Sequence, residues 1–125
     1  MMELQINGIL HSSVIVSDTR SALAFYCDVL GLPIDESRPV MNFPGAWLTV
    51  GEQQIHLLEL PNPDPVAGRP EHGGRDRHIA LAVNNLDVLQ QRLEQAGLRF
   101  TRSKSGRKAL FTRDPDGNAL EFIEV

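Results

Sequence analysis

The chain carries one pattern twice. The segment 11–18, His-Ser-Ser-Val-Ile-Val-Ser-Asp, resembles the segment 78–85, His-Ile-Ala-Leu-Ala-Val-Asn-Asn. Each opens with a histidine, continues as an apolar or alternating run, and ends in residues that favour helix N-caps. An apolar stripe at helical spacing follows in both copies, and a glycine ends it 20 residues after the first histidine and 19 residues after the second. This repeat predicts two copies of one supersecondary unit.

The two halves also end alike. The segment 55–60, Ile-His-Leu-Leu-Glu-Leu, aligns position by position with the segment 120–125, Leu-Glu-Phe-Ile-Glu-Val. A strand-like run and a turn precede each of them, the turns being Gly51-Glu52 and Asp-Pro-Asp-Gly-Asn at 114–118. Asp-Gly tolerates the positive φ that hairpin turns require. Each half is therefore predicted to run strand, helix and then three strands.

Length and composition limit what the chain can be. Its 125 residues suffice for one compact domain in which two small halves share a core. We expect a single domain, residues 1–125, with module 1 at about 7–60, a surface linker rich in Pro, Gly and charge at 61–77, and module 2 at about 78–125. The net charge of −4 argues against a general nucleic-acid binder. With one cysteine and no long apolar stretch, we expect a cytoplasmic protein without a membrane partner.

The strands carry residues that suit a metal. Because strand side chains alternate between faces, the opening histidine of each half is expected to lie on the open face of its sheet, opposite the apolar residues that pack under the helix. If the open faces of the two halves met, four ligands would converge: His11, His56, His78 and Glu121. Imidazole and carboxylate together suit Fe, Ni, Zn, Co or Mn. A lone strand histidine is usually structural, but the same two positions in both halves favour a metal site.

A basic, serine-containing edge precedes the turn at 114–118. The candidate substrate-binding residues are Ser13, which shares a face with His11, and the members of this edge, Arg102, Lys104, Ser105, Arg107 and Lys108. Such groups suit a carboxylate or a phosph(on)ate, and a solvated charged loop is the alternative. Tyr26 is interpreted as helix core, and His72, which has no counterpart in the other half, as a solvated loop residue.

The whole pattern resembles the vicinal oxygen chelate superfamily, which includes glyoxalase I, fosfomycin-resistance proteins, methylmalonyl-CoA epimerase, extradiol dioxygenases and bleomycin-binding proteins. The resemblance covers nearly the whole chain and rests on residues 11–18, 24–26, 30–32, 77–80 and 114–121. It implies an α+β fold of two tandem βαβββ modules that form a cupped, partly closed mixed sheet around one divalent metal. The ligand positions fall on His11, His56, His78 and Glu121. Position 56 carries Glu or Gln in the glyoxalase and epimerase branches and is not a ligand in three-ligand branches, so ligation by His56 stays open.

The resemblance implies a leading function and two alternatives. The leading function is that of a glyoxalase-like lyase or isomerase, in which the metal chelates two oxygens of a small anionic substrate, the enediolate is stabilised, and Glu121 moves the proton. Glutathione is the expected thiol if a co-substrate is used. The alternatives are a dioxygenase or fosfomycin-type thiol transferase, and a non-catalytic drug- or metabolite-binding protein. Relatives often form homodimers, some with modules of two chains at one metal, so we expect a homodimer.

Overall fold

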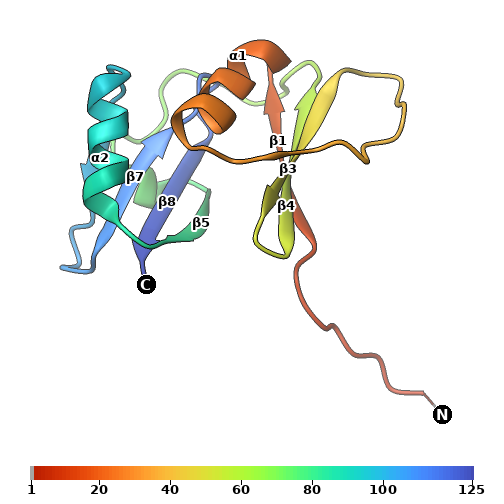
Figure 1. The fold of residues 1–125 in the computed structure, drawn as a ribbon, viewed down its shortest axis with the longest axis horizontal. Helices are drawn as coiled ribbons and strands as arrows, with labels where there is room; N and C mark the ends of the chain where they lie inside the picture. The colour runs from red at the N-terminus through yellow and green to blue at the C-terminus, as the bar shows by residue number, and fades with distance from the viewer. Residues whose placement is uncertain (1) are drawn as a thin grey trace.

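The computed structural model describes residues 2–125 and contains two βαβββ modules (Figure 1). Module 1 consists of β1 (His11–Val16), α1 (Thr19–Leu23), the π-helical η1 (Ala24–Val29), β2 (Ile34–Asp35), β3 (Gly45–Val50) and β4 (Gln53–Glu59). After the 3-10 helix η2 (Gly73–Arg75), module 2 consists of β5 (His78–Val83), α2 (Leu86–Gln95), β6 (Phe100–Arg102), β7 (Ala109–Arg113) and β8 (Ala119–Glu124). The predicted order of strand, helix and three strands is confirmed in both halves.

Each module folds into its own four-stranded mixed sheet. The strand orders are β1-β4-β3-β2 and β5-β8-β7-β6, with β1–β4 and β5–β8 parallel and the other pairs antiparallel. The predicted α+β class with mixed sheets is confirmed. Within the described residues the two sheets are not closed into a barrel, because strands pair only inside their own module. No helix within residues 2–125 is long and apolar enough to cross a membrane.

The helix side of both sheets shares one hydrophobic core. In Figure 1, α1 lies between the two sheets and α2 lies against the outer part of the second sheet. Fully buried side chains come from both modules, among them Leu48 and Leu57 from the first and Leu93 and Leu120 from the second. Burial of this apolar surface holds the modules together. The opposite face of each sheet is left for the residues described below.

Helix ends match the sequence signals in both modules. The side chains of Asp18 and Asn85 each accept a hydrogen bond from the backbone N–H three residues later, at 2.9 Å and 3.1 Å. Gly31 and Gly97, which follow the two helices, adopt φ values of +81° and +69°, a region that favours glycine. The repeated pattern of cap and glycine therefore sets the same helix boundaries in both halves.

Two glutamates hold the helix N-termini from the closing strands. Glu59 accepts the N–H of Thr19 at 2.7 Å, and Glu124 accepts the N–H of Leu86 at 2.9 Å. The carboxylates compensate free N–H groups and the positive end of the helix dipole. Strand alternation places Glu59 and Glu124 on the faces opposite His56 and Glu121.

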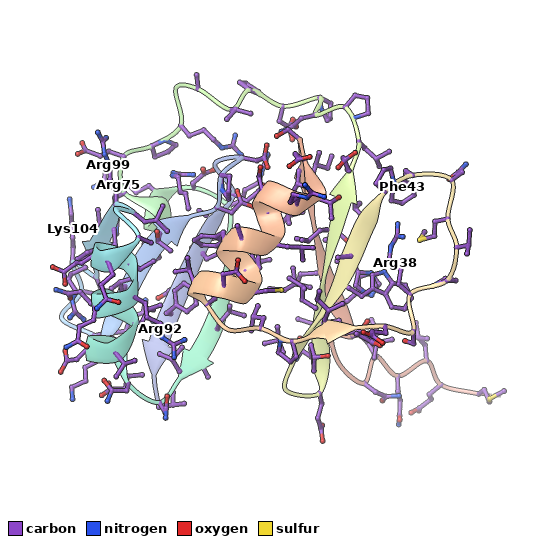
Figure 2. The ribbon with its side chains drawn as sticks, turned by 45° about the horizontal axis from the view of Figure 1, so that its top comes forward. Arg38, Phe43, Arg75, Arg92, Arg99 and Lys104 are labelled. Carbon is purple, nitrogen blue, oxygen red and sulfur yellow. The ribbon has the colours of Figure 1, made fainter. Side chains whose placement is uncertain are left out.

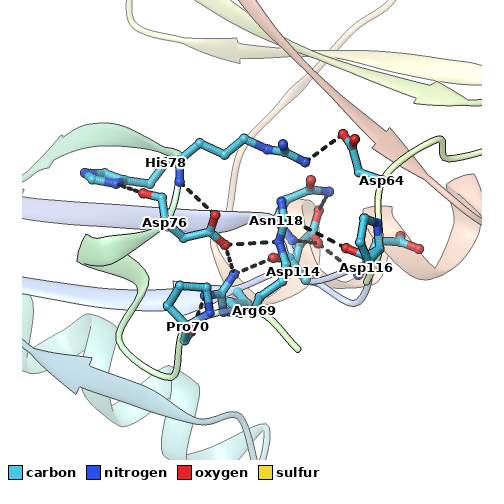
Figure 3. A network of polar contacts seen from close by, with 12 residues as sticks. Asp64, Arg69, Pro70, Asp76, His78, Asp114, Asp116 and Asn118 are labelled. Atoms are coloured by element: carbon cyan, nitrogen blue, oxygen red, sulfur yellow. Dashed lines mark hydrogen bonds and ion pairs between the residues drawn. The ribbon is translucent and has the colours of Figure 1, made fainter. Parts of the chain in front are cut away.

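The turn at 114–118 joins module 2 to module 1 (Figure 3). Buried Asp114 accepts the N–H groups of Asp116 and Asn118 at 2.9 Å each, and its Oδ2 accepts the Tyr26 hydroxyl and Asn118 Nδ2 at 2.8 Å each. Asn118 Nδ2 also donates to the backbone oxygen of Ile15 at 3.0 Å. Burial raises the pKa of the Asp114 carboxyl and raises that of Tyr26 well above its ordinary value. Tyr26 is therefore helix core, as predicted, with its hydroxyl bonded across the modules.

Candidate metal centre

The candidate ligands lie on the sheet faces opposite the shared core. Strand register places Ser13 beside His56 in the first sheet and Ala80 beside Glu121 in the second. His56 is 8 % exposed and Glu121 4 % exposed, whereas His11 and His78 at the opening strands are exposed. Each module therefore presents one open histidine beside one nearly buried ligand-type side chain.

In module 1 the two histidines stack. The ring centroids of His11 and His56 are 3.9 Å apart with planes 13° from parallel, and Trp47 stacks on the other side of His56 at 4.3 Å. His56 Nε2 donates to Gln54 Oε1 at 2.7 Å, and the Gln54 amide in turn donates to the Asp35 carboxylate. Metal-binding histidines commonly hold one nitrogen in this way while the other faces the metal.

The surroundings of His56 favour the neutral form of its ring. Burial, followed by the nearby His11, lowers the pKa of His56 below its ordinary value. With the Nε2 proton committed to Gln54, the lone pair is on Nδ1. A neutral imidazole with one free lone pair is the form that binds metals.

In module 2 His78 and Glu121 stand in direct contact. A carbonyl oxygen can only accept, so His78 Nδ1 donates its proton to the Asp76 backbone oxygen at 2.8 Å. Nε2 then faces Glu121 Oε1 at 3.1 Å, and in the neutral ring both atoms are acceptors. Two acceptors at this distance repel each other unless Nε2 carries a proton, which makes the ring an imidazolium, or a metal ion lies between them. The donor set and the tautomer of this pair therefore fit a divalent metal.

The four candidate ligands are brought into two pairs rather than one cluster. His11 lies with His56, and His78 lies with Glu121. Within residues 2–125 of one chain, no three His, Cys, Asp or Glu side chains gather closely enough to hold a metal ion. The pairs stay apart because each belongs to a separate sheet whose helix side faces the common core.

The basic edge divides between two faces. Arg107 donates to Glu121 Oε2 at 3.0 Å and, through Nε, to Ser105 Oγ at 3.1 Å, so these two residues lie at the ligand face. Arg102 instead donates to Gln90 of α2 at 2.7 Å, and Lys108 donates to Glu124 at 3.3 Å. The structure therefore places Arg102 and Lys108 on the helix side, away from Glu121, because Arg102 pairs with Leu110, which faces opposite Phe111, and Lys108 precedes Leu110 by two residues.

Lys104 is exposed, and Figure 2 shows it on the outer side of module 2. It makes no side-chain hydrogen bond or ion pair with another residue of 2–125. Ser13 lines a cavity of about 300 Å³ between β1 and β5, together with His78, Arg77 and Asn118. Of the six predicted substrate-binding residues, Ser13 thus shares a cavity with His78, and Ser105 and Arg107 adjoin Glu121.

A polar network supports the backbone that holds His78 (Figure 3). The Asp76 carboxylate accepts from Arg69 at 3.0 Å and from Arg113 at 2.8 Å. The hydrogen bond from Arg113 holds the pKa of Asp76 below its ordinary value. Arg77 pairs with Asp64 at 2.9 Å beside the same cavity. Since the Asp76 carbonyl fixes the tautomer of His78, this network orients the ring.

Sequence reasoning missed two aromatic residues at the site. Trp47 pairs in register with His56, and Phe111 pairs with Glu121, so each nearly buried ligand candidate has an aromatic neighbour on the adjacent strand. The Phe111 ring lies edge-on to His78 with centroids 5.5 Å apart. The equivalent positions of the two aromatics in the repeat were the signal that could have identified them.

The interpretation of His72 as a solvated loop residue was wrong. Its ring is half-buried, with Nδ1 2.8 Å from Thr101 Oγ1 and its centroid 4.6 Å from that of Phe111. Gly74 permits this close approach, because a Cβ there would lie only 2.9 Å from His72 Nε2 and 3.2 Å from Phe111 Cζ. His72 therefore packs on the same face of the second sheet as Glu121.

Comparison with known proteins identifies relatives along nearly the whole chain. The family described as Glyoxalase/Bleomycin resistance protein/Dioxygenase superfamily matches residues 8–122. A protein named glyoxylase I 4 from Arabidopsis thaliana is 32% identical over 125 residues, covering 95% of this chain and 71% of its own. A lactoylglutathione lyase from Salmonella typhimurium is also 32% identical, over 94% of this chain and 92% of its own. The solved lactoylglutathione lyase from Agrobacterium tumefaciens superposes with a TM-score of 0.66 at 25% identity, covering 95% and 94% of the two chains.

Proposed function

Because the chain belongs to the Glyoxalase/Bleomycin resistance protein/Dioxygenase superfamily, we propose that it is a metal-dependent lyase or isomerase of the glyoxalase type. Its substrate is a small, oxygen-chelating anion, and the reaction moves a proton between neighbouring carbons. The two relatives named for glyoxalase activity, each 32% identical to this chain, support this reaction class. A thiol such as glutathione is the corresponding co-substrate.

The contact between His78 and Glu121 is the observation that carries this proposal. His78 Nδ1 donates its proton to the Asp76 backbone oxygen, so Nε2 faces Glu121 Oε1 at 3.1 Å with a lone pair. A divalent cation would stabilise this arrangement. His11 and His56 are the two further proposed ligands. When bound, such a metal polarises two oxygens of the substrate and makes the adjacent C–H acidic.

Glu121 is the proposed base. It takes the proton from the substrate carbon and returns it to the neighbouring carbon, so the overall reaction is balanced without an oxidant. Arg107 donates to Glu121 Oε2 at 3.0 Å and orients the carboxylate. Because Arg107 is largely exposed, it can also approach an anionic group of the substrate, with Ser105 beside it. The nearly buried position of Glu121 keeps its carboxylate from bulk water.

We further propose that each metal lies between two copies of the chain, with His11 and His56 from one copy and His78 and Glu121 from the other. Two observations support this arrangement: the pairs do not meet within residues 2–125 of one chain, and one histidine of each pair, His11 and His78, is exposed. A two-fold dimer would then contain two equivalent sites. Ser13 and the basic residues near Glu121 would lie around them.

A mixing experiment tests the two-chain site. Neither His11→Ala nor His78→Ala alone is expected to bind metal at full stoichiometry. After the two variants are unfolded and refolded together, heterodimers contain one site with both substitutions and one intact site. Random pairing therefore restores metal to about one quarter of the wild-type content, measured by elemental analysis after gel filtration. If each site formed within one chain, mixing would restore nothing.

The reaction itself is tested with the hemithioacetal of methylglyoxal and glutathione. Metal-loaded protein is expected to convert it to the thioester, followed by absorbance. Without thioester formation, oxygen uptake with a catechol would identify a dioxygenase, and thiol-dependent loss of an epoxide would identify a thiol transferase. Tight binding of a ligand by metal-free protein without turnover would instead favour a binding protein.

A further inference from the structure

A second cavity, of about 660 Å³, lies where the linker 61–77 crosses the edge of the second sheet. Its apolar wall consists of Val66 and Pro70 from the linker and Phe111 from β7, while the neighbouring Leu98 and Phe100 pack against the core. This volume is in the range of small-molecule sites in proteins. The cavity does not include any of the four proposed ligands, although Phe111 contributes to both regions.

The charged groups of this cavity are mainly cationic. Arg69, Arg99 and Arg113 line it, against the single carboxylate of Glu71. Arg69 and Arg113 share the Asp76 carboxylate, and Arg113 donates in addition to the backbone oxygens of Gly117 at 2.7 Å and Pro70 at 2.6 Å. These two guanidiniums are therefore held in place by the protein itself.

Arg99 differs from the other two arginines. Its side chain is exposed and makes no ion pair or hydrogen bond with another residue of 2–125, while its backbone oxygen is fixed by the Thr112 hydroxyl at 2.7 Å. Figure 2 shows Arg99 at the end of module 2 that the linker reaches. An unpaired guanidinium at the rim of an apolar cavity suits a planar anionic group.

We propose that this cavity binds a small carboxylate with a flat apolar body. The body lies against Phe111, Val66 and Pro70, and the carboxylate pairs with Arg99 at the rim. The lining holds three arginines and one carboxylate, Glu71, and two of the arginines share the Asp76 carboxylate outside the lining. The positive charge that is left favours an anion over a neutral or cationic ligand. This site goes beyond the proposed reaction and needs no metal.

The test uses 2-naphthoate as the probe and the full-length, metal-free protein. Titration by calorimetry or intrinsic probe fluorescence is expected to show saturable binding. The neutral analogue 2-naphthamide is expected to bind about tenfold more weakly, because it lacks the charge that pairs with Arg99. Arg99→Gln is expected to raise the Kd of 2-naphthoate about tenfold, and His11→Ala, in module 1, is expected to leave it unchanged.

Arg20→Gln is the matched control, since Arg20 is exposed on α1 and the substitution removes the same charge. It is expected to change the Kd less than about twofold. No saturable binding up to about 10 mM, or equal effects of Arg99→Gln and Arg20→Gln, would overturn the site. Residues 2–9 run away from the module and expose Leu4 and Ile6. If naphthoate bound only after these residues were deleted, the segment of a second copy would be the occupant of the cavity, and the proposed site would be overturned. Failure of metal binding with intact naphthoate binding would overturn the proposed reaction alone.

Discussion

Glu121→Gln is expected to lower kcat for the hemithioacetal by at least about 10²-fold, the usual contribution of a positioned general base. An amide oxygen can still contact a cation, but it cannot accept a proton from carbon at neutral pH. The substitution also removes the charge that meets Arg107 at 3.0 Å and His78 at 3.1 Å. Turnover is measured on metal-loaded protein, with the metal content of the same sample determined in parallel.

Glu94→Gln provides the matched control. Glu94 is exposed on α2, and its side chain makes no ion pair or hydrogen bond with another described residue. It is expected to retain wild-type kcat and metal content. If Glu121→Gln retained both the metal and full turnover, Glu121 could not be the base.

Asp114→Ala is expected to lower the free energy of unfolding by about 3 kcal/mol or more. The buried carboxylate accepts two backbone N–H groups, the Tyr26 hydroxyl and the Asn118 amide, and an alanine would leave these donors without their acceptor. Because the same turn fastens module 2 to module 1, the loss is expected to loosen the contact between the modules as well. Urea denaturation followed by circular dichroism measures it.

Two further variants separate the contributions to this turn. Asp116→Ala removes only an acceptor of the Ser17 N–H at 3.0 Å near the surface and is expected to cost less than about 1 kcal/mol. Tyr26→Phe removes one hydroxyl and is expected to cost about 1–2 kcal/mol, with less than additive loss when combined with Asp114→Ala. Equal losses from Asp114→Ala and Asp116→Ala would contradict the special role of the buried carboxylate.

The fold was predictable because both halves of the chain repeat the same local signals. The caps at Asp18 and Asn85 and the glycines at 31 and 97 set helix boundaries by short-range interactions, which sequence patterns report well. The position and the two-residue length of β2 and the π-helical continuation of α1 were not predicted, since both depend on tertiary packing. The separation of the two sheets was also beyond the pattern, because alternation identifies the faces of a sheet but not which faces meet.

The candidate site was predictable only in part. Strand alternation predicts the open sheet face for the opening histidines, but the sequence predicted four ligands at one point, whereas residues 2–125 of one chain hold them as two pairs, and ligation itself stays a prediction. Contacts that depend on strand register, such as Phe111 beside Glu121, need the pairing itself. The packing of His72 needs the path of the linker, which composition alone could not supply.

Elemental analysis of gently purified protein beside His78→Ala tests the metal site most directly, with His72→Ala as the control for loss of a neighbouring histidine. We expect about one divalent metal per chain in the wild type and in His72→Ala, and almost none in His78→Ala. Equal metal content in wild type and His78→Ala would contradict the site. Absence of metal from wild type, even after reconstitution with Ni, Zn, Fe and Mn, would contradict a metal-dependent enzyme altogether.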